Sequence, residues 1–143
     1  MPEIPLVQIH GVNKVKLDKI KKPVAGPNDV VVSVSQCGIC GSDLGYIAMG
    51  GLLGPGIPMP LGHELSGTVV EAGANVTHVK NGDRVVVNPE ANNNHIGNSG
   101  GEGGFSPYLL VKGAAIDNDC VIPLPDNIDF EIGALVEPLS VSM

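Results

Sequence analysis

The sequence predicts a single, mainly β domain in which short strands alternate with many turns. Short apolar runs rich in valine and isoleucine recur along the 143 residues, and 20 glycines and 12 prolines are spread between them. β-branched residues favour strands, whereas glycine and proline favour turns. Aromatic residues make up only 3% of the chain, but a hydrophobic content of 43% is enough to form a packed core.

Seven extended segments are expected, either because apolar and polar residues alternate or because a short apolar run is bounded by turn residues. In chain order they are residues 6–10, 14–20, 29–35, 64–73, 84–87, 105–111 and 120–125. The clearest is 29–35, in which Val30, Val32 and Val34 share one face. This strand runs directly into a pair of cysteines, so their thiols should lie at a strand end.

Helical segments are expected in two places. After Cys40 the sequence favours a short helix over 42–49, with Ser42 or Asp43 as its N-cap. From residue 128 to the C-terminus the pattern is again helical in parts. Asp126 or Asp129 could be its N-cap, and Pro138 is the one proline in this segment. The proline must kink or restart this helix.

Two glycine-rich segments are predicted to be loops. Residues 50–60 lie between the first two candidate motifs, where a loop can shape a substrate entrance. Residues 88–104 are polar and contain no cysteine, so we expect a surface loop or a partly disordered one.

Charge and cysteine content exclude several classes of function. A net charge of −7 without a basic run argues against nucleic acid and anionic membrane as partners. The N-terminus has neither the basic region nor the apolar core of a signal peptide, so we expect a cytoplasmic protein. The three cysteines, an odd number, favour metal binding or packing over a disulfide framework.

We predict that one zinc ion is bound by Cys40, His63 and one or both of Glu64 and Glu137. Thiolate, imidazole and carboxylate groups together form a typical zinc ligand set. An exchangeable position for water or substrate would make the ion catalytic. For Glu64 and Glu137 a structural ion pair is the alternative. Cys37 lies three residues before Cys40, and for it a packed thiol is favoured over a redox-active or metal-binding one.

Several short motifs occur in order and at suitable spacing for one known family. They are residues 38–43, 62–64, 82–85, 103–105 and 137–139, which read GICGSD, GHE, GDRV, GGF and EPL. With these motifs the chain resembles the catalytic, GroES-like domain of zinc-dependent medium-chain alcohol dehydrogenases. The nearest branch is that of sorbitol, threonine and butanediol dehydrogenases. The resemblance implies an irregular GroES-like β-barrel with short helices over residues 1–143.

The resemblance also implies roles for individual residues. Cys40 and His63 would be zinc ligands, and Glu64 a ligand in some members and therefore a catalytic candidate. Glu137 matches a position where the polyol branch has a glutamate that binds zinc directly or through water. The remaining roles fall to three residues of one segment: Asp43 would orient His63, Ser42 would accept the substrate proton, and Tyr46 would line the substrate pocket.

Two departures from the family pattern affect these expectations. Many relatives have four clustered cysteines that bind a structural zinc, but residues 88–104 have none, so we expect one catalytic zinc and no structural one. Relatives often have a histidine of the proton relay where Gly45 stands, which leaves no relay residue there beyond Ser42.

The expected function is hydride transfer between an alcohol, with a diol or polyol favoured, and NAD or NADP. No Gly-x-Gly-x-x-Gly motif follows a strand, and the chain ends at Met143 in a helix-like context. We therefore expect that a nucleotide-binding domain is absent from this chain, which should bind zinc without turning over an alcohol. The complete enzyme is expected to be a homo-oligomer.

Two other functions remain open at this point. The domain could be a non-enzymatic GroES-like module for protein contacts, or a zinc-free relative of quinone and enoyl reductases. Neither has a need for Cys40, His63, Glu64 and Glu137 together, and these four residues therefore favour the dehydrogenase.

Overall fold

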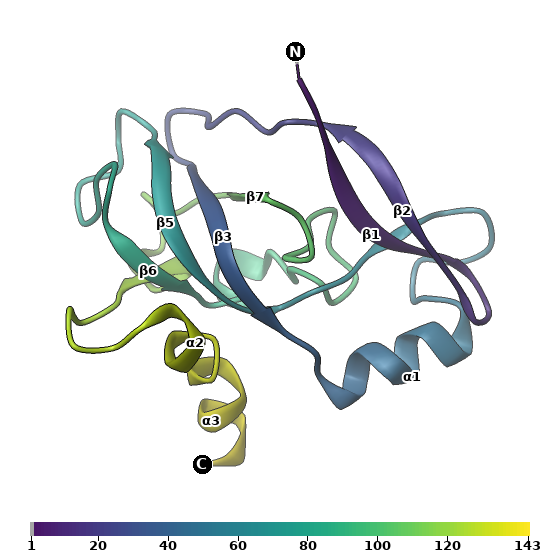
Figure 1. Ribbon diagram of the computed structural model, residues 1–143. Coiled ribbons are helices and arrows are strands. Elements are labelled where there is room, and N and C mark those ends of the chain that lie inside the picture. The colour runs from purple at the N-terminus through teal and green to yellow at the C-terminus, as the bar shows by residue number, and fades with distance from the viewer. Residues whose placement is uncertain (1) are drawn as a thin grey trace.

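The computed structural model describes residues 2–143, which form eight strands, three α-helices and two short 3₁₀ helices (Figure 1). The strands are β1 (Glu3–Gly11), β2 (Lys14–Lys21), β3 (Val30–Gly38), β4 (Met59–Pro60), β5 (Glu64–Ala72), β6 (Arg84–Val87), β7 (Tyr108–Val111) and β8 (Val121–Pro123). The helices are α1 (Gly41–Met49), η1 (Ala91–Asn93), η2 (Asn118–Cys120), α2 (Phe130–Gly133) and α3 (Val136–Ser142).

The strands form two antiparallel sheets. One has the order β2-β1-β4, and the other has the order β7-β3-β5-β6-β8. The prediction of a mainly β domain with short helices is confirmed, but the strands within residues 2–143 form two open sheets and not one closed barrel. In Figure 1, β3 extends from the larger sheet toward the β1–β2 hairpin and leads into α1, while α2 and α3 lie below β5 and β6.

The larger sheet carries the main core, and β3 lies in its interior. Val30 and Val32 are fully buried, as the alternating pattern predicts, but Val31 on the opposite face is buried as well. Both faces of β3 are therefore covered by other parts of the molecule. In the smaller sheet, by contrast, Val15 and Leu17 alternate as predicted and still remain exposed.

The helix ends differ in part from the prediction. Cys40, and not Ser42 or Asp43, is the N-cap of α1, and Asp43 in the first turn accepts a hydrogen bond from the Cys40 amide at 2.9 Å. Asp129 caps α2 as predicted, because its carboxylate accepts from the Ile132 amide at 2.8 Å. Pro138 lies in the first turn of α3, where a proline is tolerated, so the chain starts a new helix there.

The segment 88–104 is packed more tightly than the sequence suggests. Ile96 is fully buried in the core of the larger sheet, and its amide donates to the carbonyl of Pro89 at 3.1 Å. Gly97 lies so close to the Gly62 backbone that a Cβ on residue 97 would be 2.3 Å from the Gly62 carbonyl oxygen. The prediction of a surface loop or a partly disordered one fails at Ile96 and Gly97, which are buried, and Gly97 packs directly against the residue that precedes His63.

Replacing Gly97 with alanine tests this packing. The added Cβ would meet the Gly62 backbone, and the φ of +62° also disfavours a side chain. We expect the free energy of unfolding, measured by urea denaturation, to fall by about 2–4 kcal/mol. The matched control is Gly101→Ala in the same segment, where a Cβ meets no atom within 4 Å and the stability should change by less than about 0.5 kcal/mol. Equal stabilities of the two variants would contradict the close approach.

Candidate metal centre

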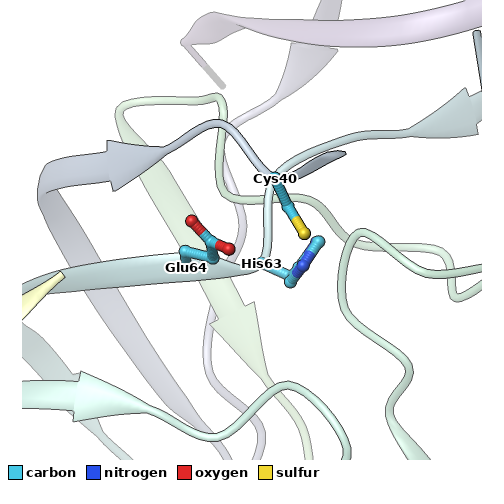
Figure 2. Close-up of side chains that lie close together, drawn as sticks. All are labelled: Cys40, His63 and Glu64. Carbon is cyan, nitrogen blue, oxygen red and sulfur yellow. The ribbon is translucent and has the colours of Figure 1, made fainter. Parts of the chain in front are cut away.

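The pairing of β3 with β5 brings the first candidate ligands together. Gly38, at the end of β3, pairs with Glu64, at the start of β5. Because the strands are antiparallel, Cys40 just beyond Gly38 and His63 just before Glu64 must lie near each other. One ligand atom from each of Cys40, His63 and Glu64 lies within 4.8 Å of the other two. Figure 2 shows the Cys40 sulfur pointing toward the His63 ring, with the Glu64 carboxylate beside them.

Asp43 connects the α1 cap to the His63 ring. One carboxylate oxygen accepts from the Cys40 amide, and the other lies 3.5 Å from His63 Nδ1. Asp43 is 1% exposed, and neither Asp43 Oδ1 nor His63 Nδ1 has a hydrogen-bond partner among the residues described. The two orphaned atoms face each other, so Asp43 favours a proton on Nδ1. Such a tautomer leaves Nε2 free to bind a metal ion.

The surroundings of His63 favour a positive charge at this point. The nearby Asp43 carboxylate raises the pKa of His63 to about 9, with smaller contributions from Cys40 and Glu137, while burial acts in the opposite direction. A proton supplies the positive charge in the metal-free chain. A metal cation at the same place would compete with that proton.

Glu137 reaches the centre from the C-terminal helices. Its Oε2 lies 4.0 Å from His63 Nε2, although it does not belong to the three-residue cluster. Burial raises the pKa of Glu137, and the charges of Glu64, Glu90 and Asp43 raise it further, against the lowering effect of His63. Several acidic groups therefore surround one imidazole, an arrangement that a dication would stabilise.

Two residues of the larger sheet, Ser66 and Arg84, hold the segment before α3 in place. The Ser66 hydroxyl donates to the carbonyl of Phe130 at 2.5 Å. The Arg84 guanidinium donates to the carbonyls of Ile128 and Pro125 at 2.5 and 3.3 Å, and it also lies over the Phe130 ring. Arg84 and Ser66 thus fix the direction from which Glu137 approaches.

The Glu64 carboxylate depends on the glycine opposite it in the sheet. A Cβ on Gly38 would lie 2.7 Å from Glu64 Oε2. The absence of a side chain at residue 38 therefore leaves the space that this carboxylate occupies.

These residues fit a zinc ion. Sulfur, nitrogen and oxygen donors converge, Asp43 faces only Nδ1 of His63 so that Nε2 can exchange its proton for a metal ion, and the surrounding charge is negative. Cys40, His63 and Glu64 would hold the ion, and Glu137 is near enough to join them after a small movement.

The structure places the other candidate residues on α1 and β3. Ser42 is half-buried in the first turn of α1, and within residues 2–143 its hydroxyl forms no hydrogen bond. The Tyr46 hydroxyl donates to Asn98 Oδ1 at 2.6 Å. Cys37 packs against the core, and burial raises the pKa of its thiol to about 12, as suits a packed thiol.

Sequence reasoning missed Glu90 and Asn98. Both lie in the segment 88–104 and are linked to Tyr46 and to the surroundings of Glu137. Tyr46 and Asn98 are 52 positions apart, so no local pattern could have indicated their contact.

Comparison with known proteins identifies the family. Residues 26–126 match the model of the alcohol dehydrogenase GroES-like domain, which covers well over half of the chain. The chain belongs to the alcohol dehydrogenase GroES-like domain family. The resemblance inferred from the motifs is therefore confirmed.

Curated relatives of this GroES-like domain include two dehydrogenases. It is 37% identical over 158 residues to (R,R)-butanediol dehydrogenase of Bacillus subtilis, an alignment that covers 94% of this chain and 44% of that protein. It is 39% identical over 150 residues to human sorbitol dehydrogenase, with 94% and 42% covered. The chain thus spans less than half the length of these relatives.

Among solved structures, the Bacillus subtilis butanediol dehydrogenase matches with a TM-score of 0.82 and 35% identity. The match covers 97% of this chain and 45% of that one.

None of the helices formed by residues 2–143 combines the length and the apolar character needed to cross a bilayer.

Substituting Gly38 tests the space reserved for Glu64. We expect Gly38→Ala to displace the Glu64 carboxylate and to weaken zinc binding at least about tenfold, measured by competition with a chromophoric chelator. Gly41→Ala is the matched control on the other side of Cys40, because a Cβ there has no neighbour within 4 Å. Equal zinc affinities of the two variants would exclude this role for Gly38.

The metal-free chain should lose stability as the pH rises through the range in which His63 titrates. A folded pKa of about 9, above the ordinary value of 6.5, means that charged His63 stabilises the fold. This contribution is complete below pH 6.5, and it is lost as the pH rises through about 9. The expected decline in the free energy of unfolding is on the order of 3 kcal/mol, measured by urea denaturation of chelator-treated protein.

Asp43→Asn supplies the control for this prediction, because the Asp43 carboxylate is the main cause of the raised pKa. The pH-dependent decline should shrink in this variant, whatever its absolute stability. A decline of unchanged size would show that another group is responsible.

Proposed function

We propose that this chain is the zinc- and substrate-binding part of a dehydrogenase that transfers hydride between an alcohol and NAD or NADP. The observation that carries the proposal is the convergence of Cys40, His63 and Glu64 within 4.8 Å. The butanediol and sorbitol dehydrogenases among its relatives support an alcohol with more than one hydroxyl as substrate. We further propose a cytoplasmic, homo-oligomeric enzyme with a single, catalytic zinc.

In this proposal each residue of the centre has a separate task. Cys40, His63 and Glu64 hold the zinc, with Glu137 as a fourth ligand, and the second carboxylate, that can approach or withdraw. When bound, zinc supplies Lewis acidity, which makes the hydroxyl of a neighbouring alcohol easier to deprotonate. Asp43 keeps the proton on His63 Nδ1, and this proton holds the ring in its binding orientation.

The proton and the hydride leave the alcohol by different routes. The Ser42 hydroxyl, at the start of α1, is free to accept the proton of the alcohol and pass it on. The hydride would go to a nicotinamide. Because no nucleotide-binding glycine motif follows a strand of this chain, we propose that residues outside it bind the cofactor. The relatives, more than twice as long, leave ample length for such a domain.

The first test is the zinc content of protein purified without added metal, determined by elemental analysis. We expect about one zinc per chain, lost in Cys40→Ser. Cys37→Ser is the matched control, since that half-buried thiol is three residues away and packs against the core, and the variant should retain the metal. Zinc retained in Cys40→Ser, or lost equally in both variants, would refute the proposed centre.

A further inference from the structure

Strand β2 forms an outer edge of the smaller sheet, whose order is β2-β1-β4 (Figure 1). Its pairing with β1 is regular from Glu3↔Lys21 to Ile9↔Val15, without a bulge, and the strand contains no proline. Its other side pairs with no strand among residues 2–143. Bulges and prolines are common protections of sheet edges, because unpaired backbone groups can bind a further strand. An eight-residue edge is therefore open in β2.

The hydrogen bonds of β1 show which backbone groups of β2 point outward. The Lys22 amide donates to the carbonyl of Pro2 at 2.9 Å, so Lys22 turns its backbone groups toward β1. In an antiparallel ladder this direction alternates from one residue to the next. Val7 gives the same phase, because both of its backbone groups bond to segments other than β2, and it pairs with Leu17. The outward N–H and C=O groups therefore belong to Val15, Leu17, Lys19 and Lys21.

The charge of the chain is segregated, and β2 carries its positive part. Residues 14–22 hold five of the eight lysine and arginine residues and one of the 15 acidic residues, which gives this segment a net charge of +4. The rest of the chain has a net charge of −11. The one acidic side chain of the segment, Asp18, is engaged by His10 Nε2 at 2.5 Å and by Gln8 Nε2 at 2.9 Å. Residues 14–22 thus form a basic edge on an acidic domain.

The lysines of β2 lack the partners that the other basic side chains have. Lys80 pairs with Asp83 at 3.1 Å. Lys112 pairs with Glu102 at 3.8 Å, and Arg84 donates to two carbonyl groups. Among residues 2–143, no carboxylate lies within 4.0 Å of the ammonium groups of the four exposed lysines of β2. Four positive charges along one open edge are therefore available to an acidic partner.

Apolar side chains lie between these lysines. Leu17 is 69% exposed and Val15 is 44% exposed, and both lie on the face of β2 that also carries Lys19 and Lys21. A hollow of about 390 Å³ beside the edge is lined in part by Pro5, Leu17 and Lys19. The same face thus offers apolar contact and positive charge to a strand that pairs with β2.

We propose that β2 is a docking edge for an acidic segment in extended conformation, which adds to the smaller sheet as a further strand. A peptide is favoured because another strand satisfies the outward N–H and C=O groups in register. The lysines select an acidic segment, and they oppose the pairing of β2 with β2 of a second copy. A nucleic acid cannot continue the ladder, and the net charge of −11 on the rest of the chain repels it. No residue of the basic edge belongs to the candidate metal centre, so the inference does not depend on the proposed function.

A peptide designed for this edge is the probe, and fluorescence anisotropy of a labelled form measures its affinity. In the peptide ETETVEVE, antiparallel pairing places glutamates opposite the four lysines and valines opposite Leu17 and Val15. We expect a dissociation constant on the order of 100 µM at low salt, and weaker binding as the salt concentration rises. Proline in place of the first valine keeps the charge of the peptide but removes the amide that bonds to Leu17. This second peptide should bind at least about fivefold more weakly.

Hydrogen exchange of individual amides, followed by NMR, tests the geometry. In the free chain the amides of Asp18 and Ile20, which face β1, should exchange slowly. The amides of Leu17 and Lys19 point outward and should exchange fast. A saturating concentration of the peptide should slow exchange at the outward amides by about tenfold and leave the inward ones unchanged.

Two double variants with the same change in net charge separate the edge from the charge of the whole chain. Lys16→Gln with Lys19→Gln removes two charges from β2 and should weaken the binding of ETETVEVE at least about fivefold. Lys80→Gln with Lys112→Gln removes two charges elsewhere and should change the affinity less than about twofold.

Four results would each overturn the inference. The first is that ETETVEVE does not bind. The second is that the proline peptide binds equally well or that exchange at the outward amides is not slowed, because charge alone would then attract the peptide. The third is tighter binding of a single-stranded oligonucleotide of the same charge, which would identify a nucleic-acid surface. The fourth is protection of the outward amides that grows with the concentration of the free chain, which would show that a second copy occupies the edge.

Discussion

The register between β3 and β5 is the constraint on which the candidate centre depends. Gly38 pairs with Glu64 only because two irregularities in the ladder, after Val31 and after Val34, each shift the pairing. A change of one residue would turn Glu64 to the other face of the sheet and move Cys40 away from His63. The buried valines of β3 make such a change costly, because they would leave the core. The packing of the sheet and the geometry of the ligands are thus determined together.

Beside the paired strands β3 and β5, other segments of the chain lie very close to the backbone of Gly62, the residue before His63. Gly62 has a φ of +102°, and a Cβ on it would lie 2.6 Å from the Phe105 amide nitrogen. Gly97 and Gly104 approach Gly62 from the segment 88–104. Glycines permit this contact, and it places a long polar segment against the residue beside His63. The segment therefore contributes to the centre even though its own side chains are not ligands.

The sequence was sufficient for features that depend on neighbouring residues and on residue chemistry. Alternation of apolar residues predicted β3, and donor chemistry predicted that Cys40, His63 and Glu64 converge. Contacts between distant segments could not be predicted in this way. A pattern of neighbours does not show that Ile96 is buried within a polar stretch, nor that Asn98 binds Tyr46. The N-cap of α1 was missed for a related reason. Aspartate is a residue type that favours the N-cap, but Asp43 lies in the first turn and accepts a hydrogen bond from the amide of Cys40, which is the N-cap.

The acidic and thiol groups of the centre come from different parts of the chain, and this arrangement suits the proposed chemistry. Cys40 and Glu64 are fixed by the ends of two paired strands, and Asp43 is buried. Glu137 lies in the first turn of α3, and its Oε2 is 4.0 Å from His63 Nε2. In the proposed centre, Cys40, His63 and Glu64 define a position for a metal ion, and the withdrawal of Glu137 would leave room for a substrate oxygen. A closed set of four protein ligands suits a structural metal, whereas an exchangeable fourth position suits a catalytic one.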